Sequence, residues 1–536
     1  MSDIRLPMLD FRRMTAPTRA IVVAVAAGVV VLGLAAAVLY ALSDFVTDDA
    51  LISLRYSRHL ADGRGLRWNT DEQPVEGYSN FLHVALGAGA QRLGISPLAT
   101  LRALNWLAAL CLLPVTWSLA RLFGAGRWAL AAPVCLGLNV PLAYWAASGL
   151  ETALYTCIGT SALLLAWSSR RARWPVAALL LLGCTCRPEG PLFILAVTAP
   201  AGLGLLASAR NGWGRAMTDL VGAHAKLILV VVLGLGIYGA WRWQYFGYPL
   251  PNPVYIKANS GQPWDLIVDF VVQNPISLPL AVVGVVLRPT PHRVGGLVLV
   301  LAYGMMLYNV KASVADLHRF FVPVIPTLLA LAAAGIAHVG TSRPSRLFLP
   351  LAMTCLVAAT QLGHPQSGMI QARRRVVALN ARMHARVELV RWIQQAVPHG
   401  RVAIGDVGVV GYGLDLHVMD LFGLNSKSAA HDFKHRKDYV LSVVNSEPHL
   451  IVLVSKRAGQ FDAKYKTDTW VRASAPFKKK YRHVHTVSPR RGRYHYWIYL
   501  HNWIYLHNDR TPSGATSVAE ESTRLVAKID RLRGLH

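Results

Sequence analysis

The stretch that decides the fold is SDFVTDDALISLRYSRHLADG, residues 43–63, which follows directly after a long apolar run. That run, residues 20–42, is longer than the apolar part of a signal peptide, and no A-x-A cleavage site follows it closely. It therefore predicts a first membrane-spanning helix. Asp48 and Asp49 stand where this helix should end, one turn after Asp44. A carboxylate at a membrane boundary is costly when it is buried alone, so it is usually paired or functional.

The composition of the chain indicates a polytopic α-helical membrane protein. Of its 536 residues 53% are hydrophobic and 15% are charged, whereas a soluble protein carries about 25% charged residues. A formal charge of +27 is also typical of nucleic-acid binding, but the sequence has no zinc-finger spacing, recognition-helix pattern or RNA-binding signature. Basic loops beside a lipid bilayer account for much of the charge, so we expect no nucleic acid as a partner.

Eleven apolar runs approach the length of about 20 residues that a spanning helix needs. They are residues 20–43, 98–121, 128–147, 150–168, 174–186, 190–209, 226–246, 270–287, 294–310, 320–339 and 346–363. With an arginine-rich, cytoplasmic N-terminus, every second short loop carries at least two arginines, as the positive-inside rule requires. The sequence thus predicts a bacterial cytoplasmic (inner) membrane protein whose opposite loops and C-terminal tail face the periplasm.

We expect two domains. Residues 1–363 form a transmembrane catalytic domain with a long first outer loop, residues 44–97, and residues 364–536 form an extracytoplasmic α/β domain. In the first outer loop ALISLRYSRHLA predicts an amphipathic helix with its leucines against lipid and Arg55, Arg58 and His59 at the headgroups. In the tail RVAIGDVGVVGYG predicts a strand and turn, HLIVLVSK a buried strand, and YHYWIYLHNWIYLHN, with its repeated hexamer, further strand.

Asp48 and Asp49 have two interpretations. They can be solvated at a helix end and cap the next helix. Alternatively, one is a catalytic base: a like-charged neighbour and a partly apolar surround raise the pKa of one acid, which suits a group that removes a proton from a sugar hydroxyl. The sequence does not choose between the two acids.

The outer loops also carry groups that suit a phosphate and a sugar. Four could bind a phosphate leaving group, because arginine offers planar bidentate donors and lysine a point charge: Arg187, Lys257, His318 and Arg319. Others could bind the sugar or the acceptor: Arg55, Glu76, Tyr78, Asn80, Glu151, Glu189, Asn252 and Tyr255. Glu151 and Glu189 could instead be structural partners of the cations. Singly, such residues are usually snorkelling side chains or structural ion pairs, but their gathering on one side of the membrane favours a site. The sequence has no dedicated metal-ligand cluster.

Several of these motifs together resemble a known family. TDDALISLRYSRHLADGRGLRWN and VEGYSNFL, with SGLETALY, RPEG, PNPVYIKAN and HRFFVPVIP, are similar to polytopic C-type (GT-C) glycosyltransferases that use polyprenyl-phosphate sugars. The likeness runs from about residue 40 to 430 and is strongest to the arabinofuranosyltransferase group, which includes mycobacterial terminal and pilin arabinosyltransferases.

The resemblance implies a function for these residues. It implies transfer of a furanose, D-arabinofuranose, from a polyprenyl-phosphate donor to an extracytoplasmic glycan or glycoprotein, such as arabinan or pilin. It assigns catalysis to Asp48 or Asp49 and phosphate recognition to the four cations above. It leaves open a divalent metal as cofactor and whether transfer inverts or retains configuration.

A membrane transporter or flippase of a lipid-linked sugar is the main alternative, because paired acids and intramembrane arginines also suit ion-coupled transport. A transporter should show polar residues at mid-span and paired halves of the chain, whereas here the polar set lies on one side and no inverted repeat is apparent. A membrane scaffold with a basic tail is a second alternative, but it would not need the acids.

Overall fold

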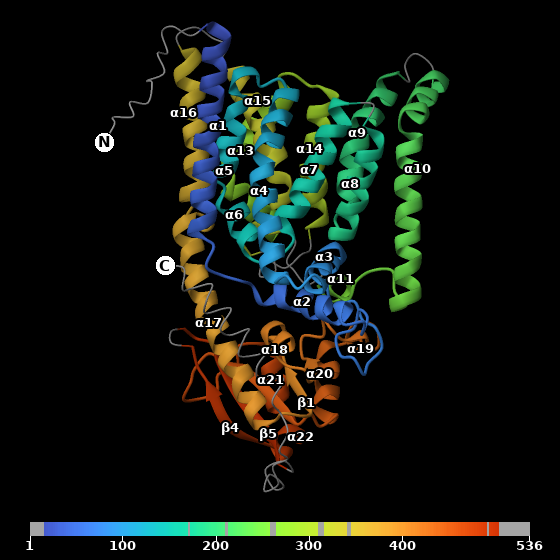
Figure 1. The fold of residues 1–536 in the computed structure, drawn as a ribbon, viewed down its shortest axis with the longest axis vertical. Coiled ribbons are helices and arrows are strands. Elements are labelled where there is room, and N and C mark those ends of the chain that lie inside the picture. Colours follow the sequence, from blue (N-terminus) through green and yellow to red (C-terminus); the bar gives the residue numbers. More distant parts are fainter. Residues whose placement is uncertain are drawn as a thin grey trace, which may run out of the picture.

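The computed structural model describes residues 15–169, 172–208, 213–257, 264–308, 316–339, 345–489 and 492–502. Long helices form an upright bundle, and a smaller unit that contains a β-sheet lies at the end of the bundle opposite the start of α1 (Figure 1). A layer with the short helices α2, α3 and α11 lies between the two (Figure 1). These helices carry six of the predicted site residues: Asp48, Asp49, Arg55, Asn252, Tyr255 and Lys257.

A helix occupies each apolar run that the sequence predicts as a span. The bundle helices are α1 (Ala16–Ala41), α4 (Pro97–Leu122), α5 (Ala131–Gly137), α6 (Val140–Ala147), α7 (Thr152–Ser168), α8 (Arg173–Cys186), α9 (Pro191–Ser208), α10 (Trp213–Phe246), α12 (Asp265–Gln273), α13 (Ser277–Val286), α14 (Pro291–Met306), α15 (Ile325–Val339) and α16 (Ser345–Gly363). Two runs are broken into pairs of helices: α5 and α6 are bent by 50°, and α12 and α13 by 88°.

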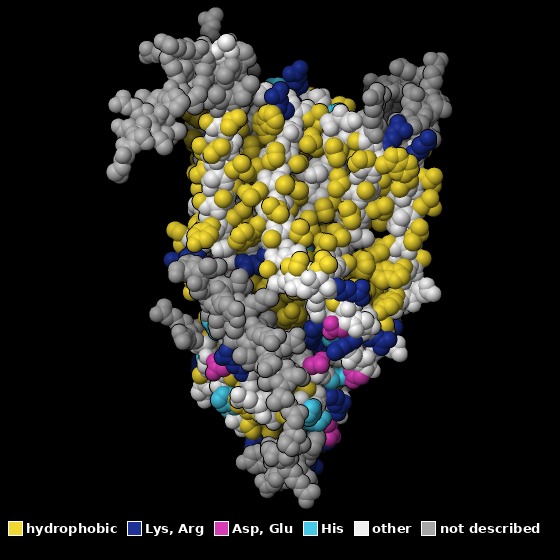
Figure 2. All heavy atoms as spheres, in the orientation of Figure 1, with side chains coloured by type: hydrophobic (Ala, Val, Ile, Leu, Met, Phe, Trp, Pro, Cys, Tyr) yellow, Lys and Arg dark blue, Asp and Glu magenta, His cyan; other side chains and the backbone are white. Residues whose placement is uncertain are grey.

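Three helices among the described residues are long and apolar enough to cross a membrane, or up to five if each bent pair is one span. Five shorter apolar stretches of 10–17 residues also lie in helices of the bundle. Eleven crossings therefore stay a prediction, as does the domain division at residue 363. Hydrophobic side chains cover the side of the bundle, and acidic and histidine side chains gather at the sheet end (Figure 2). This distribution fits a bundle surrounded by lipid.

The intermediate layer consists of α2 (Asp48–Ala61), α3 (Phe81–Arg92) and α11 (Asn252–Lys257). The prediction that α2 lies against lipid is wrong. Leu51, Leu54 and Arg55 are 3%, 2% and 2% exposed, and His59 is fully buried. The physical reason is that α2 packs between α3 and the sheet unit, where Arg55 finds backbone carbonyl partners.

The sheet unit follows α17 (Met369–Ala396) in the chain. This helix leaves the bundle and runs beside the sheet unit (Figure 1). Its elements are β1 (Arg401–Ile404), α18 (Val407–Gly413), β2 (His417–Asp420), α19 (Lys427–His431), α20 (Arg436–Asn445), β3 (Leu450–Ser455), α21 (Lys466–Ala473), α22 (Ala475–Lys480), β4 (Tyr481–Val487) and β5 (His495–His501). The sheet order is β2-β1-β3-β5-β4. Strand β1 pairs in parallel with β2 and β3, and β5 pairs antiparallel with β3 and β4.

Three local predictions can be compared with these elements. The buried strand at HLIVLVSK is confirmed as β3, all of whose residues are buried. The turn expected within GDVGVVGYG is wrong, because residues 407–413 form the helix α18. The first WIYLHN copy begins within β5, whereas the second copy, residues 503–508, lies outside the described residues.

Helices α13 and α15 pack very closely because glycines stand where they meet. A Cβ atom on Gly335 would lie 2.0 Å from the carbonyl oxygen of Leu280, and one on Gly284 would lie 2.5 Å from that of Leu331. Small residues let helix backbones approach in a membrane, where dispersion forces drive packing. This contact anchors α15, and the segment just before α15 carries Arg319.

We predict that Gly335→Ala destabilises the bundle, because the added methyl group has no room and overpacking costs about 1–3 kcal/mol. The melting temperature of the purified protein in detergent, followed by tryptophan fluorescence, should fall. Gly304→Ala on α14 is the matched control, because nothing lies within 4 Å of its added Cβ. Equal melting of the two variants would contradict the close contact.

Candidate active site

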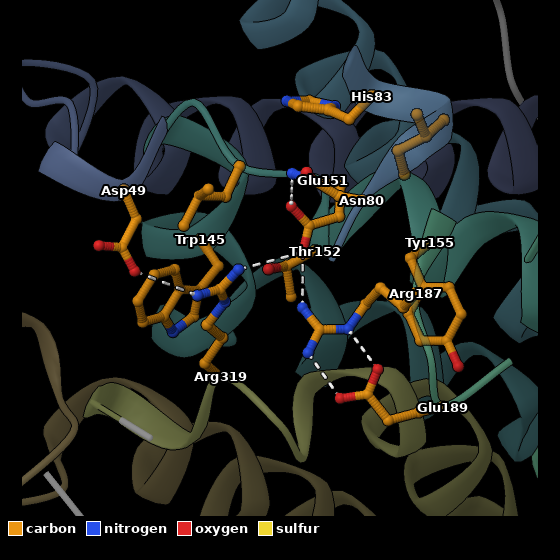
Figure 3. Close-up of polar contacts among 12 residues, drawn as sticks. Asp49, Asn80, His83, Trp145, Glu151, Thr152, Tyr155, Arg187, Glu189 and Arg319 are labelled. Carbon is orange, nitrogen blue, oxygen red and sulfur yellow. Dashed lines mark hydrogen bonds and ion pairs between the residues drawn. The ribbon is translucent and has the colours of Figure 1, made fainter. Parts of the chain in front are cut away.

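The carboxylate of Glu151, at the N-cap of α7, is the centre of a buried polar cluster (Figure 3). Glu151 is 0% exposed. Its Oε2 accepts a hydrogen bond from Asn80 Nδ2 at 2.7 Å, and its Oε1 accepts from Arg187 Nη1 at 2.6 Å and from Arg319 Nη2 at 3.0 Å. One side chain thus ties together α3, α7, α8 and the segment before α15.

The charge of Glu151 is held by its partners. Burial alone would raise the pKa of this carboxyl, but the guanidinium groups of Arg319 and Arg187 outweigh burial and lower the pKa below its ordinary value. Glu151 is therefore ionised, and it fixes the positions of both arginines through charge-assisted hydrogen bonds.

Arg187 has its charge satisfied within this cluster. Its Nε and Nη2 donate to the two carboxylate oxygens of Glu189 at 3.0 and 2.7 Å, in addition to the bond from Nη1 to Glu151. The side chain is 5% exposed. Of the two interpretations that the sequence allows for Glu189 and Glu151, the geometry favours structural partners of a cation over sugar ligands.

Arg319 is presented by a strained turn. Leu317 and His318 have φ values of 43° and 53°, in the left-handed region that non-glycine residues rarely adopt. Trp145 Nε1 donates to the carbonyl of Leu317 at 3.1 Å, and the guanidinium of Arg319 lies 5.3 Å from the centroid of the Trp145 ring. Such strain of about 1–3 kcal/mol per residue is typical of functional sites. The Nε of Arg319 is buried without a hydrogen-bond partner among the described residues.

The two adjacent acids have different surroundings. Asp48 has a side chain 15% exposed, and its carboxylate oxygens accept from the amides of Gly408 and Val409 at 3.0 and 2.9 Å. Asp49 has a side chain 52% exposed, and its Oδ2 lies 3.9 Å from Arg319 Nη1. That distance is too long for a hydrogen bond, so Asp49 is the more accessible of the two acids.

Helix geometry explains this division. Neighbouring residues on an α-helix point about 100° apart around its axis. At the start of α2, Asp48 therefore reaches the sheet unit while Asp49 reaches the bundle. The amide of Thr47, just before α2, donates to the carbonyl of Ser148 at 3.0 Å, which holds the start of the helix beside the loop that carries Glu151.

Three other predicted residues lie in the intermediate layer but outside the Glu151 cluster. Glu76 accepts two hydrogen bonds from Arg242 of α10, at 3.0 and 2.6 Å. Asn252 donates to the carbonyl of Ser426 at 2.8 Å. Tyr78 is 3% exposed, and its hydroxyl has no hydrogen-bond partner among the described residues. These contacts connect the bundle, the first outer loop and the sheet unit.

Tyr255 and Lys257 belong to α11. The ring of Tyr255 meets that of His431 edge-on at 4.7 Å. Lys257 is the last residue of α11, and its side chain lies outside the described part of the chain.

His318 is adjacent in sequence to Arg319 but has different contacts. It is 5% exposed, its Nε2 is hydrogen-bonded to Gln273 Oε1, and its Nδ1 lies 3.6 Å from Asp269. Burial lowers the pKa of His318 to about 4, although Asp269 opposes this shift. The imidazole is thus neutral at pH 7 and contributes no positive charge for a phosphate.

Sequence reasoning missed the cations of α17. Arg375 and Arg382 belong to α17, which contacts α6, and the guanidinium of Arg382 lies 4.7 Å from the centroid of the Tyr494 ring. The hydroxyl of Tyr144 on α6 is buried without a hydrogen-bond partner among the described residues. Further along the helix, Arg386 Nε lies 3.6 Å from Asp48 Oδ1. The amphipathic pattern gave no signal for these roles, because an arginine on the polar face of such a helix is normally solvated.

The residues of this site do not fit a divalent metal. Glu151 is already paired with two arginines, and one of them, Arg319, also lies 3.9 Å from Asp49. Across the described ranges, no group of three or more His, Cys, Asp or Glu side chains is placed to hold a metal ion. No step below is assigned to a metal.

The bundle, with its acid-bearing first outer loop, has the GT-C membrane fold. The chain is similar to ArnT from Cupriavidus metallidurans in the apo state, with a TM-score of 0.56, 14% identity, and coverage of 90% of this chain and 98% of ArnT. ArnT bound to undecaprenyl phosphate gives the same values. The chain is also similar to the archaeal oligosaccharyltransferase AglB from Archaeoglobus fulgidus, in complex with an inhibitory peptide and a dolichol-phosphate. The TM-score is 0.53 and the sequence identity 11%, with coverage of 79% of this chain and 69% of AglB.

The sequence comparisons add one region. Residues 374–499 match a family described as a domain of unknown function, DUF8728. A comparison with curated proteins gives no match. The matched region comprises most of α17 and the sheet unit. It includes Gly408, whose amide donates a hydrogen bond to Asp48.

We predict that Glu151→Gln destabilises the protein at neutral pH by about 3 kcal/mol or more, the usual cost of leaving buried charges unpaired. Because folding lowers the pKa of Glu151, its stabilising effect is complete above the unfolded pKa of about 4.3 and is lost as pH falls through the lower folded pKa. The difference between wild type and variant in thermal unfolding should therefore shrink below pH 4. Asp415→Asn, which breaks the exposed pair with Arg64, is the control and should change little. A pH-independent difference would contradict the ionised state of Glu151.

Proposed function

We propose that this protein transfers a sugar from a polyprenyl-phosphate carrier to an extracytoplasmic acceptor, with Asp49 as the catalytic base. The observation that carries the proposal is the separation of the two acids. Asp48 is held by two amides, whereas Asp49 stays exposed beside Arg319, whose position is fixed by buried Glu151. An accessible carboxylate next to a pre-positioned guanidinium can serve a reaction that moves a proton and releases an anion.

In the proposed reaction an acceptor hydroxyl oxygen attacks the anomeric carbon of the donor sugar. The bond from that carbon to the phosphate oxygen breaks, and its electron pair leaves with the polyprenyl phosphate. Asp49 takes the hydroxyl proton, and Arg319 stabilises the negative charge that develops on the phosphate. A single displacement inverts the anomeric configuration; a retaining outcome would instead need a carboxylate nucleophile, and Asp49 is the exposed one.

The phosphate of the donor needs more positive charge than Arg319 provides. Arg187 is paired with two glutamates and His318 is neutral, so neither adds free charge. We assign the further positive charge to Arg375 and Arg382 of α17, a helix that contacts α6. ArnT binds undecaprenyl phosphate and AglB a dolichol-phosphate, and the shared fold supports a lipid-linked donor here.

For the sugar we propose D-arabinofuranose, and for the acceptor an envelope glycan such as arabinan, or pilin. The support is the set of motifs shared with the arabinofuranosyltransferase group, from TDDALISLRYS to HRFF. We further propose that the sheet end of the bundle faces the periplasm. The support is that arginine-rich loops are expected at the other end, where α1 begins (Figure 1).

The decisive experiment is a transfer assay with purified protein, synthetic polyprenyl-phosphoryl arabinose and candidate acceptors. Mass spectrometry of surface glycans and pilin from a deletion strain identifies the missing sugar and its acceptor. Transport of the lipid-linked sugar across proteoliposomes without transfer would favour the flippase alternative and would overturn the proposed function.

We predict that Asp49→Asn reduces kcat by about 100-fold or more, the usual contribution of a general base, while the protein still folds and inserts. Asp62→Asn is the matched control, because Asp62 is an exposed acid at the other end of the same helix. Initial rates at saturating donor and acceptor test this. Full activity of Asp49→Asn would remove the carboxylate from the mechanism.

We also predict that Arg319→Lys lowers kcat/KM for the donor by about 100-fold, in the range for loss of one pre-positioned charge-stabilising group. Lysine keeps the charge but lacks the planar fork that reaches both Glu151 and Asp49. Arg121→Lys, an exposed arginine at the far end of α4, is the control. A donor-independent loss of rate would contradict the proposed phosphate role.

A further inference from the structure

The start of the candidate catalytic helix is held by the sheet unit. Both carboxylate oxygens of Asp48 accept hydrogen bonds, from the amides of Gly408 and Val409 at 3.0 and 2.9 Å. Arg386 approaches the same carboxylate at 3.6 Å and also donates to Asp406 at 3.1 Å. Asp48 is thus joined to two segments of the region 374–499.

The rest of α2 is held from the same side. The guanidinium of Arg55 donates to the carbonyl oxygens of Leu414 and Leu416, each at 3.0 Å, and also to that of Gly411. Arg58 donates to the carbonyl of Tyr412 at 3.0 Å. These bonds use backbone acceptors at the end of α18, so they fix the height of α2 above the sheet unit as well as its rotation.

The loop after α2 continues this contact. Trp68 Nε1 donates to the carbonyl of Val418 at 2.7 Å, and Asn69 Oδ1 accepts from the Val418 amide at 3.0 Å. Tyr56 of α2 donates to Asn425 Oδ1 at 3.1 Å. The contact between α2 and the sheet unit therefore continues from Asp48 to Asn69.

Glycines allow the close approach on which these bonds depend. A Cβ on Gly408 would lie 2.0 Å from the backbone oxygen of Asp48, and one on Gly411 would lie 2.4 Å from the Trp68 ring. A Cβ on Gly77 would lie 2.0 Å from Asn425 Oδ1. Distances below 3.0 Å are not tolerated, and at Gly408 the obstructing atoms are backbone, which cannot move aside without moving α2.

We propose that the sheet unit positions the catalytic base, with Asp48 as a positioning residue rather than a catalytic one. Holding Asp48 on the amides of residues 408 and 409 fixes the rotation of α2, and this rotation directs Asp49 toward Arg319. This inference rests on the proposed function. It gives the region of unknown function, residues 374–499, a role in catalysis: it sets the geometry of a helix that lies more than 300 residues earlier in the chain.

Gly408→Ala tests the proposal in the full-length protein. The added methyl group should shift α2 and lower kcat by about 100-fold, the scale expected for a misplacement of about 1 Å, while KM for the donor stays nearly unchanged. Amides 49–54 of α2 should exchange faster with deuterium. Gly459→Ala is the matched control, because it lies in the same unit with nothing within 4 Å of its added Cβ.

Asp48→Asn is the second variant. Asparagine keeps one acceptor oxygen, so one of the two amide bonds can survive, and we expect a kcat between those of Gly408→Ala and wild type. Normal turnover by folded Gly408→Ala would overturn the proposal, as would an equal loss of kcat in Gly459→Ala. A wild-type protein without turnover would instead show that the proposed function itself is wrong.

Discussion

The buried carboxylate of Glu151 is the group on which the sheet end of the bundle depends. It lies where three helices and a strained turn meet, and its negative charge can stay in that position only because two guanidinium groups neutralise it. Each arginine has a second acidic neighbour, Glu189 for Arg187 and Asp49 for Arg319. Arg319 therefore links the buried carboxylate of Glu151 to the exposed carboxylate of Asp49.

Much of this cluster could be predicted from the sequence. Asn80, Glu151, Arg187, Glu189 and Arg319 come from four different loops, with Arg187 and Glu189 in the same one, and the structure brings all five together. The prediction works because most of these loops are short: a polar residue next to an apolar helix has to stay near the end of that helix. Chemistry and the side of the membrane were enough to group these residues, although not to pair them.

What the sequence could not provide was the role of each residue. Asp48 and Asp49 are chemically identical neighbours, and only their contacts with groups distant in the chain distinguish them: Gly408 for Asp48 and Arg319 for Asp49. Arg55 has the pattern of an interfacial residue and is nevertheless buried, because its acceptors are carbonyls of another unit. Likewise, His318 loses its expected charge through burial, a property that no local pattern records.

The charge of the cluster explains why α17 matters for both substrate and base. Three carboxylates, Asp49, Glu151 and Glu189, face two guanidinium groups, so the cluster as it stands would repel a phosphate. Arg375, Arg382 and Arg386 lie within about 16 Å of one another along the helix axis. The helix contacts α6, and Arg386 lies 3.6 Å from Asp48. A single rigid helix therefore joins the cations assigned to the phosphate to the residue that orients α2, so a shift of α17 would change donor binding and the position of Asp49 together.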